Sequence, residues 1–95
     1  MSVNQLQGHQ VRAARAILDW SVRQLAQISE VSESSIRRIE SSFGVPENVS
    51  LDLLMRLREF FEARGFTFLF DGDEGSGVRY RRRIERRHAE RRRGG

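Results

Sequence analysis

The strongest constraint on how this chain folds lies in the stretch SVRQLAQISEVSESSIRRIE. Ser21 precedes Gln24 by three residues, which is the spacing of a capping box at the start of a helix. Ser32 is a second candidate N-cap, and the apolar residues Ile36 and Ile39 follow it at a helical spacing. The stretch therefore predicts two short helices joined by a tight turn.

The second of these helices would leave most of its surface polar. If it buries only Ile36 and Ile39, the side chains that point elsewhere are Glu33, Ser34, Arg37 and Arg38. Simple solubility would account for such a surface. Two adjacent arginines beside two serines, next to another short capped helix, favour instead a helix that enters a groove of DNA. We therefore interpret the pair as a DNA-reading helix-turn-helix.

A wider set of residues carries a family resemblance. The run VRAARAILDWSVRQLAQISEVSESSIRRIESSFGVP, residues 11–46, contains these matching pieces: Val11 to Leu18, Trp20-Ser21, Leu25-Ala26, Val31-Ser32, Ile36, Arg38, Glu40, Gly44 and Pro46. In combination they resemble the phage-repressor-like helix-turn-helix family, of the Cro/repressor or xenobiotic-response-element type. The resemblance extends over residues 5 to about 70 and is closest to small single-domain members that end in a β-hairpin. It implies a mainly α fold, a lambda-repressor-like helix-turn-helix bundle of about four helices plus a C-terminal β-hairpin.

The resemblance also implies a function and a site. Members of this type are sequence-specific regulators of transcription that bind a double-stranded DNA operator, and we expect a repressor that acts as a homodimer without a cofactor. The positions that face the bases are Glu33, Ser34 and Arg38, of which Arg38 can donate two hydrogen bonds to a guanine and Glu33 can accept one from a cytosine. Contacts to the DNA backbone fall on Ser21, Arg23, Gln24, Ser32, Ser35, Arg37 and Ser41. Val22 occupies a position where members often carry a polar contact residue.

One departure from the family pattern concerns the turn between the two helices. The family has glycine there because the backbone takes a positive φ, whereas this chain has Glu30. A residue other than glycine in that conformation costs about 1 kcal/mol. We expect packing by Ile28 and Val31 to hold the turn.

Length and composition limit the classes of protein to consider. The 95 residues fit one small domain with a tail, and the absence of cysteine excludes disulfides and thiolate metal sites. No apolar run approaches the ~20 residues of a membrane span, and the start MSVNQLQG lacks the pattern of a signal peptide. We expect a cytoplasmic protein of a bacterium or phage.

Charge is distributed unevenly along the chain. Residues 1–78 carry 8 Arg and 11 Asp or Glu, a net charge of −3, whereas residues 79–95 carry 9 Arg and 2 Glu, a net charge of +7. An acidic domain can bind DNA only if its binding face is locally positive, or if the tail supplies the attraction. The arginines available for such a face are Arg23, Arg37 and Arg38.

The remaining segments divide the chain into three parts. We expect residues 1–65 to form the helix-turn-helix domain, residues 66–82 a hairpin, and residues 83–95 an arginine-rich tail that is either a disordered end or an arm on DNA. The first helix is expected over residues 6–19, burying Val11, Ala14, Ile17 and Leu18 and leaving Arg12 and Arg15 outside. A loop over residues 41–48 should tuck Phe43 and Val45 into the core. The last helix should begin after Ser50 and end at Gly65.

The hairpin and the last helix are the expected dimer surface. Residues 66–70 favour a strand, residues 71–77 a glycine-rich turn and residues 78–82 a returning strand. Because an isolated two-stranded hairpin is marginal in water, it must lie on the helices, pair with another chain, or both. The predicted interface comprises Leu57, Phe60, Phe61, Phe66, Phe68, Phe70, Val78 and Tyr80. The alternative is that the apolar stripe of the last helix packs within its own chain.

Other functions fit the sequence less well. His9 and His88 are far apart and read as surface residues, and no catalytic or metal-binding cluster is apparent, so we expect no enzyme. The group Asp71, Asp73 and Glu74 would need a glutamate where Arg82 stands to form a calcium loop. The main alternative is a protein-binding antiactivator or antitoxin that uses the same scaffold and hairpin, and RNA binding through the tail is a third option.

Overall fold

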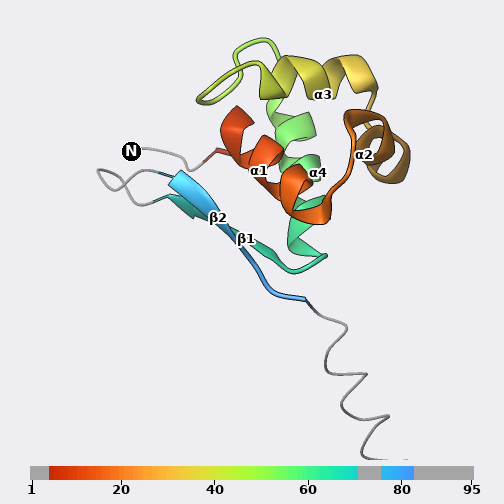
Figure 1. The fold of residues 1–95 in the computed structure, drawn as a ribbon. Helices are drawn as coiled ribbons and strands as arrows, with labels where there is room; N and C mark the ends of the chain where they lie inside the picture. Colours follow the sequence, from red (N-terminus) through yellow and green to blue (C-terminus); the bar gives the residue numbers. More distant parts are fainter. Residues whose placement is uncertain (1–4, 71–75, 83–95) are drawn as a thin grey trace, which may run out of the picture.

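The computed structural model describes residues 5–70 and 76–82 of the chain. Four helices are followed by one antiparallel hairpin, in the order α1 (Gly8–Leu18), α2 (Val22–Ser29), α3 (Glu33–Glu40), α4 (Leu51–Glu62), β1 (Phe66–Phe70) and β2 (Ser76–Tyr80) (Figure 1). The expected arrangement, mainly helical with about four helices and a terminal hairpin, is confirmed. The expected turn residues 71–75, which include Asp71, Asp73 and Glu74, lie outside the described residues, and so do His88 and the predicted tail.

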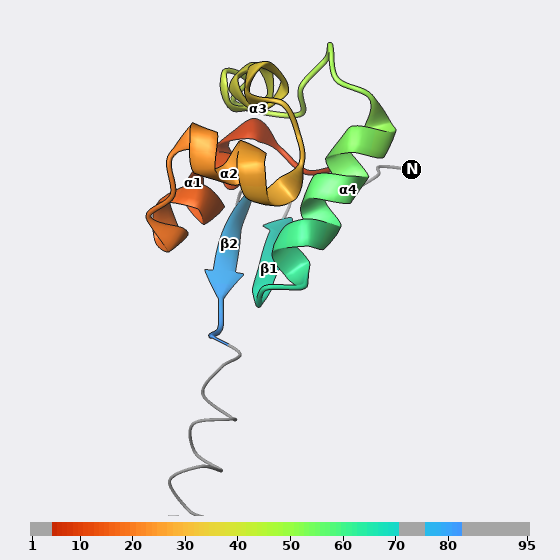
Figure 2. The ribbon, with the colours of Figure 1, turned by 90° about the vertical axis from the view of Figure 1, so that its right-hand side faces the viewer.

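The hairpin and α3 lie on opposite sides of the helical group. α3 contacts α1 and α2, while β2 contacts α1 and β1 contacts α4. Figure 2, turned by a right angle from Figure 1, shows β2 beneath α1 and β1 beside α4, with α3 at the far end of the molecule. The hairpin thus closes one side of the core, and α3 is left on the other side.

Serine side chains set the starts of three helices. Ser21, Ser32 and Ser50 are the N-caps of α2, α3 and α4, and each hydroxyl accepts a hydrogen bond from the backbone N–H three residues later. At α2 the box is complete, because the Ser21 N–H also donates to Gln24 Oε1 at 2.8 Å. These bonds satisfy amide groups that a helix start would otherwise leave without a partner.

The turn between α2 and α3 has the predicted strained backbone. Glu30 has φ of 64°, in the left-handed region that favours glycine. Its N–H donates to Ala26 O at 2.9 Å, and Val31 beside it is buried. Ile28, the other residue expected to hold the turn, is 44% exposed, so packing at the turn comes from Val31.

The core is formed by one cluster of apolar side chains drawn from the four helices and β1, with Val78 and Tyr80 of β2 packed against it. Its buried members are Leu6, Val11, Ala14, Leu25, Val31, Ile36, Ile39, Leu54, Leu57, Phe61, Phe66 and Phe68. Trp20, at the junction of α1 and α2, packs against this cluster with its ring 6.2 Å from that of Phe60. The core therefore ties the hairpin to the helices within one chain.

Three predicted core residues lie outside this cluster. Phe43 is 78% exposed and Val45 46% exposed, because the loop before α4 is bonded to the start of α1. The ring of Phe43 stacks on His9 instead of entering the core. His9 is half-buried there and bonds to the Phe43 carbonyl, so it is more than an ordinary surface residue. Ile17 is 45% exposed, since it lies at the margin of a buried stripe centred on Val11 and Ala14.

Half of the predicted dimer interface is occupied within the single chain. The buried face of the hairpin presents Phe66 and Phe68 to Phe61, with ring centroids 5.3 and 6.1 Å from that of Phe61. Leu57, Phe61, Phe66 and Phe68 are all at most 4% exposed, and so offer no surface to a partner. Those four are therefore core residues, and the predicted interface keeps only its half-buried members, Phe60, Phe70, Val78 and Tyr80, as a prediction.

A buried glutamine fastens the hairpin to α1. Gln10 is fully buried, and its Nε2 donates to Leu69 O at 3.1 Å and to Gly77 O at 2.9 Å. Leu69 and Gly77 are paired across the two strands, so one side chain bonds to both of them. Its Oε1 accepts from the Gln7 N–H at 3.0 Å.

β2 begins at Ser76, two residues earlier than the sequence suggested.

We predict that Gly8→Ala destabilises the fold severely. A Cβ at Gly8 would lie 1.9 Å from Ser42 O and 2.2 Å from Ile39 O, both backbone atoms that cannot move aside easily. The loss should reach or exceed the roughly 1–3 kcal/mol typical of overpacking, as measured by urea unfolding followed by circular dichroism. Gly44→Ala is the matched control, since nothing lies within 4 Å of a Cβ there. Equal stability of the two variants would contradict the close approach.

Candidate nucleic-acid interface

The inner side of α3 is buried, which fixes its opposite side as an exposed surface. Ile36 and Ile39 are fully buried, and Glu40 beside them is 9% exposed. On a helix these three positions lie on one face, so the side chains about half a turn away point outward. Those outward residues are Ser34, Arg37, Arg38 and Ser41, all of them exposed.

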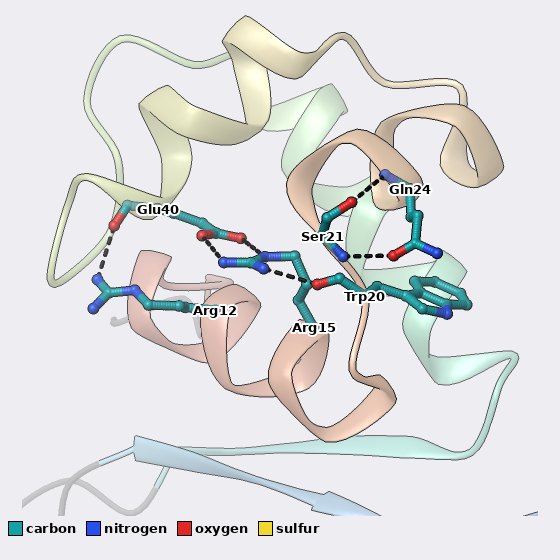
Figure 3. A network of polar contacts seen from close by, with 6 residues as sticks. All are labelled: Arg12, Arg15, Trp20, Ser21, Gln24 and Glu40. Carbon is teal, nitrogen blue, oxygen red and sulfur yellow. Dashed lines mark hydrogen bonds and ion pairs between the residues drawn. The ribbon is translucent and has the colours of Figure 1, made fainter.

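A bidentate ion pair fixes α3 relative to α1. Arg15 Nε donates to Glu40 Oε2 at 2.8 Å, and Arg15 Nη2 donates to Glu40 Oε1 at 2.9 Å (Figure 3). The Arg15 side chain is 21% exposed and that of Glu40 is 9% exposed. The parallel pair of bonds holds both planar groups in one orientation.

The same guanidinium reaches the start of α2. Arg15 Nη1 donates to Trp20 O at 2.8 Å, immediately before the N-cap Ser21, and Arg12 Nη2 donates to Glu40 O at 2.8 Å (Figure 3). Arg15 therefore joins three segments: α1, the entry to α2, and the end of α3.

The hydrogen bond to Glu40 raises the pKa of Arg15, with burial acting in the opposite direction and the charge of Glu40 adding to the rise. Because the pKa of Arg15 is higher in the folded protein, its positive charge adds to the free energy of unfolding, and this contribution is fully present below the ordinary arginine pKa. The contribution is lost only as the pH rises through the still higher folded-state pKa. The stabilising contribution of the Arg15 charge is therefore insensitive to pH near neutrality.

Of the three residues predicted to face bases, two occupy the outward surface. Ser34 and Arg38 are exposed and lie one turn apart. Arg38 forms no ion pair with any residue that the structure describes, so its guanidinium is available to a ligand. Ser41, one turn beyond Arg38, donates its hydroxyl to Arg38 O at 2.8 Å.

Glu33, the third, lies toward α2. Its carboxylate is 3.6 Å from Arg23 Nε and 3.5 Å from Arg37 Nη2, and its side chain is 41% exposed. A shallow hollow lies here between the starts of α2 and α3, lined by Arg15, Ser21, Val22, Arg23, Glu33 and Arg37. Glu33 thus offsets part of the positive charge of this hollow.

The remaining predicted backbone contacts surround the two helix starts. Ser32 Oγ accepts from the Ser35 N–H at 3.2 Å and lies 3.3 Å from Ser34 Oγ, so three hydroxyls gather at the start of α3. Gln24 uses its carbonyl oxygen in the cap of α2, while its amide nitrogen bonds to no other described residue. The structure thus brings Ser21 and Arg23 beside Glu33 at the start of α3, bonds Gln24 to Ser21 in the cap of α2, and leaves Arg37 and Ser41 exposed on the outer side of α3.

Sequence reasoning missed two residues that position this surface. Arg15 was expected outside the fold with Arg12, yet it is the centre of the polar network, and Gly8, which lies against the end of α3, was not singled out. Gln10, which fastens the hairpin, was missed as well. A signal for Glu40 was present, since it lies one position after the buried Ile39 and four after Ile36. A carboxylate at such a position needs a cationic partner.

Two further features are absent from the part of the chain that the structure describes. No group of three or more His, Asp or Glu side chains could hold a metal ion among residues 5–70 and 76–82. No described helix has the length and continuous apolar character needed to cross a bilayer. A scan of known protein families and a search of curated proteins returned no match to this chain.

We predict that Glu40→Gln lowers the free energy of unfolding by about 1.5–3 kcal/mol, the size of a hydrogen bond to a charged group. The substitution keeps the shape of the side chain but removes the charge opposite Arg15. Glu33→Gln is the matched control on the same helix, and its exposed ion pairs should contribute no more than about 1 kcal/mol. Urea denaturation measures both, and similar losses would contradict a special role for the Arg15–Glu40 pair.

Proposed function

We propose that the protein is a sequence-specific, double-stranded DNA-binding regulator of transcription. In this proposal α2 and α3 are the two helices of a lambda-repressor-like helix-turn-helix, and α3 enters the major groove. The observation that carries it is the outward surface of α3, where Ser34 and Arg38 stand exposed on a helix whose other side is buried and ion-paired. The resemblance of residues 11–46 to phage-repressor-like regulators supports the same conclusion.

Each exposed side chain has a distinct part in the proposed complex. Arg38, with no carboxylate partner among the described residues, donates two hydrogen bonds to one guanine. Ser34 contacts the neighbouring base edge. In the proposed complex Ser21, Gln24 and Ser32, at the starts of α2 and α3, lie next to a phosphate and donate hydrogen bonds from their hydroxyl and amide groups.

The arginines around Glu33 bind the DNA backbone in this proposal. Arg23 and Arg37 are 79% and 66% exposed, so both can turn from Glu33 to a phosphate. Exposed ion pairs of this kind are weak, and a phosphate can replace the carboxylate at little cost. Glu33 is then released to accept a hydrogen bond from a cytosine, or remains to orient the two guanidinium groups.

The homodimer belongs to this proposal. Two copies related by a two-fold axis would present two α3 helices to half-sites about one helical turn apart. The half-buried side chains Phe60, Phe70, Val78 and Tyr80 are the members of the predicted surface that a second copy can still cover. Repression is the expected outcome when such a dimer covers a promoter.

A protein-binding role is the second candidate, and one observation favours it. Phe43 and Val45 form an exposed apolar tip next to the end of α3, and Leu51 and Met55 are exposed on α4. Protein partners commonly bind through such aromatic and apolar groups. An antiactivator or antitoxin would use this surface, and a gel shift with the protein's own promoter region separates the two functions, because a protein-binding role gives no sequence-specific shift.

We predict that Arg38→Ala weakens binding to the cognate site by about 1–3 kcal/mol and relaxes the preference at one base pair. Selection from random duplexes identifies the site, and fluorescence anisotropy measures the affinities. Arg37→Ala is the matched variant on the same helix. It should weaken binding to all duplexes alike and flatten the salt dependence. The opposite assignment of effects would mean that the two roles are exchanged.

We predict a mass of about twice the 11.1 kDa of one chain in light scattering at micromolar concentration. Tyr80→Asp should lower that mass, because a carboxylate at the half-buried surface would have to be desolvated on association. Thr67→Asp, on the exposed side of the hairpin, is the control and should leave the mass unchanged. A wild-type protein that stays at the monomer mass contradicts the dimer.

A further inference from the structure

The end of the hairpin gathers exposed arginines that have no carboxylate partner among the described residues. Arg81 N–H donates to Gly65 O at 2.9 Å, which brings the end of β2 beside the turn that contains Arg64. Arg79 lies directly opposite the exposed Thr67. We call Arg64, Arg79, Arg81 and Arg82 the hairpin-end cluster, and all four are exposed.

The hairpin-end cluster holds more unneutralised charge than the surface of α3. None of its four arginines forms an ion pair with a residue described by the structure, whereas Arg23 and Arg37 share Glu33. Arg64 is held in place, because its guanidinium lies 4.0 Å from the centre of the Phe60 ring. The sequence that follows, residues 83–95, adds 6 Arg and 2 Glu. Positive charge is therefore most concentrated where the chain leaves β2.

The cluster is far from α3. In both Figure 1 and Figure 2 the end of β2 lies at the opposite extremity of the molecule from α3, with α1 and α4 between them. A duplex that lies along α3 therefore does not meet Arg79, Arg81 and Arg82 at the same place. Whatever the cluster binds is a different segment of ligand from the one that α3 would bind.

We propose that the hairpin-end cluster is a second phosphate-binding surface, which holds the backbone of a duplex DNA segment other than the one beside α3. Arginine suits this role because its planar fork matches the geometry of a phosphate. The face of the hairpin that carries Arg79 and Thr67 has no exposed large hydrophobic side chain among the described residues, and so lacks the apolar centre of a protein interface. Phe70, Val78 and Tyr80 alternate with these positions along the strands and lie on the other face, toward the core.

The chemistry of this surface sets its behaviour. Arg79 and Arg81 lie two residues apart in the chain and so share one side of the extended backbone, while Arg82 directly follows Arg81 and adds a third positive charge at the end of β2. Contacts of this kind neutralise phosphates without reading base edges. The cluster should therefore bind duplex DNA of any sequence, with an affinity that falls as salt rises. This inference does not require α3 to read bases.

The test measures binding of the full chain to a short fluorescein-labelled duplex of mixed sequence over a series of salt concentrations. The triple variant Arg79→Gln/Arg81→Gln/Arg82→Gln should flatten the slope of log K against log salt by up to about 2.7, because each lost phosphate contact removes about 0.9. The triple lysine variant at the same positions keeps the charge and should retain most of the slope. Arg56→Gln, which removes an exposed charge on α4, controls for net charge and should change the slope little.

The outcomes separate this inference from the proposed function. The triple glutamine variant should weaken binding to selected and mixed duplexes alike and preserve the preference between them, whereas Arg37→Gln/Arg38→Gln should abolish that preference. Circular dichroism verifies folding, and if the triple variant unfolds, Arg79→Gln and Arg82→Gln are compared singly for a change of about 0.9 each. An unchanged slope, or one that Arg56→Gln flattens equally, overturns the inference. So does a loss of binding to single-stranded RNA that leaves duplex binding intact.

Discussion

The bidentate bond between Arg15 and Glu40 is the interaction on which the arrangement of the helices depends. It joins the last turns of α1 and α3, and its third donor reaches the carbonyl that precedes the cap of α2. Hydrophobic packing by Ile36 and Ile39 is not directional and would allow α3 to slide or rotate on the core. The fixed geometry of two charge-assisted hydrogen bonds removes that freedom. The burial of Ile36 and Ile39 turns Ser34 and Arg38 outward, and the ion pair holds the helix in that orientation.

The parts of this structure that could be predicted are those governed by local chemistry. The helix starts at Ser21, Ser32 and Ser50 depend on a hydroxyl and an amide only three residues away, and the positive φ at Glu30 depends on the turn alone. The strand at residues 66–70 follows from a run of phenylalanine and threonine that favours extended backbone. These features need no knowledge of the rest of the chain.

The parts that could not be predicted depend on contacts between distant residues. Arg15 has the spacing of a surface residue on α1, and it is half-buried because Glu40, from α3, packs against it. Phe43 has the composition of a core residue, yet the bond from Gly8 N–H to Gly44 O at 2.8 Å holds its loop outside. The four interface residues that proved to be core, Phe66 and Phe68 among them, show the same limit. An apolar side chain signals burial, but the sequence alone does not say against which chain.

The position of Gln10 has a consequence for how the hairpin keeps its alignment. Strands shifted by one residue would turn every side chain to the opposite face and expose the phenylalanines that now pack on Phe61. Such a shift would also separate Leu69 O from Gly77 O, the two acceptors of the Gln10 amide, which lie side by side in the present register. The buried amide would then lack acceptors in an apolar surrounding. The two hydrogen bonds of Gln10 on α1 can therefore form in only one register of the strands. A side chain on the first helix thus selects the register of a hairpin more than fifty residues later in the chain.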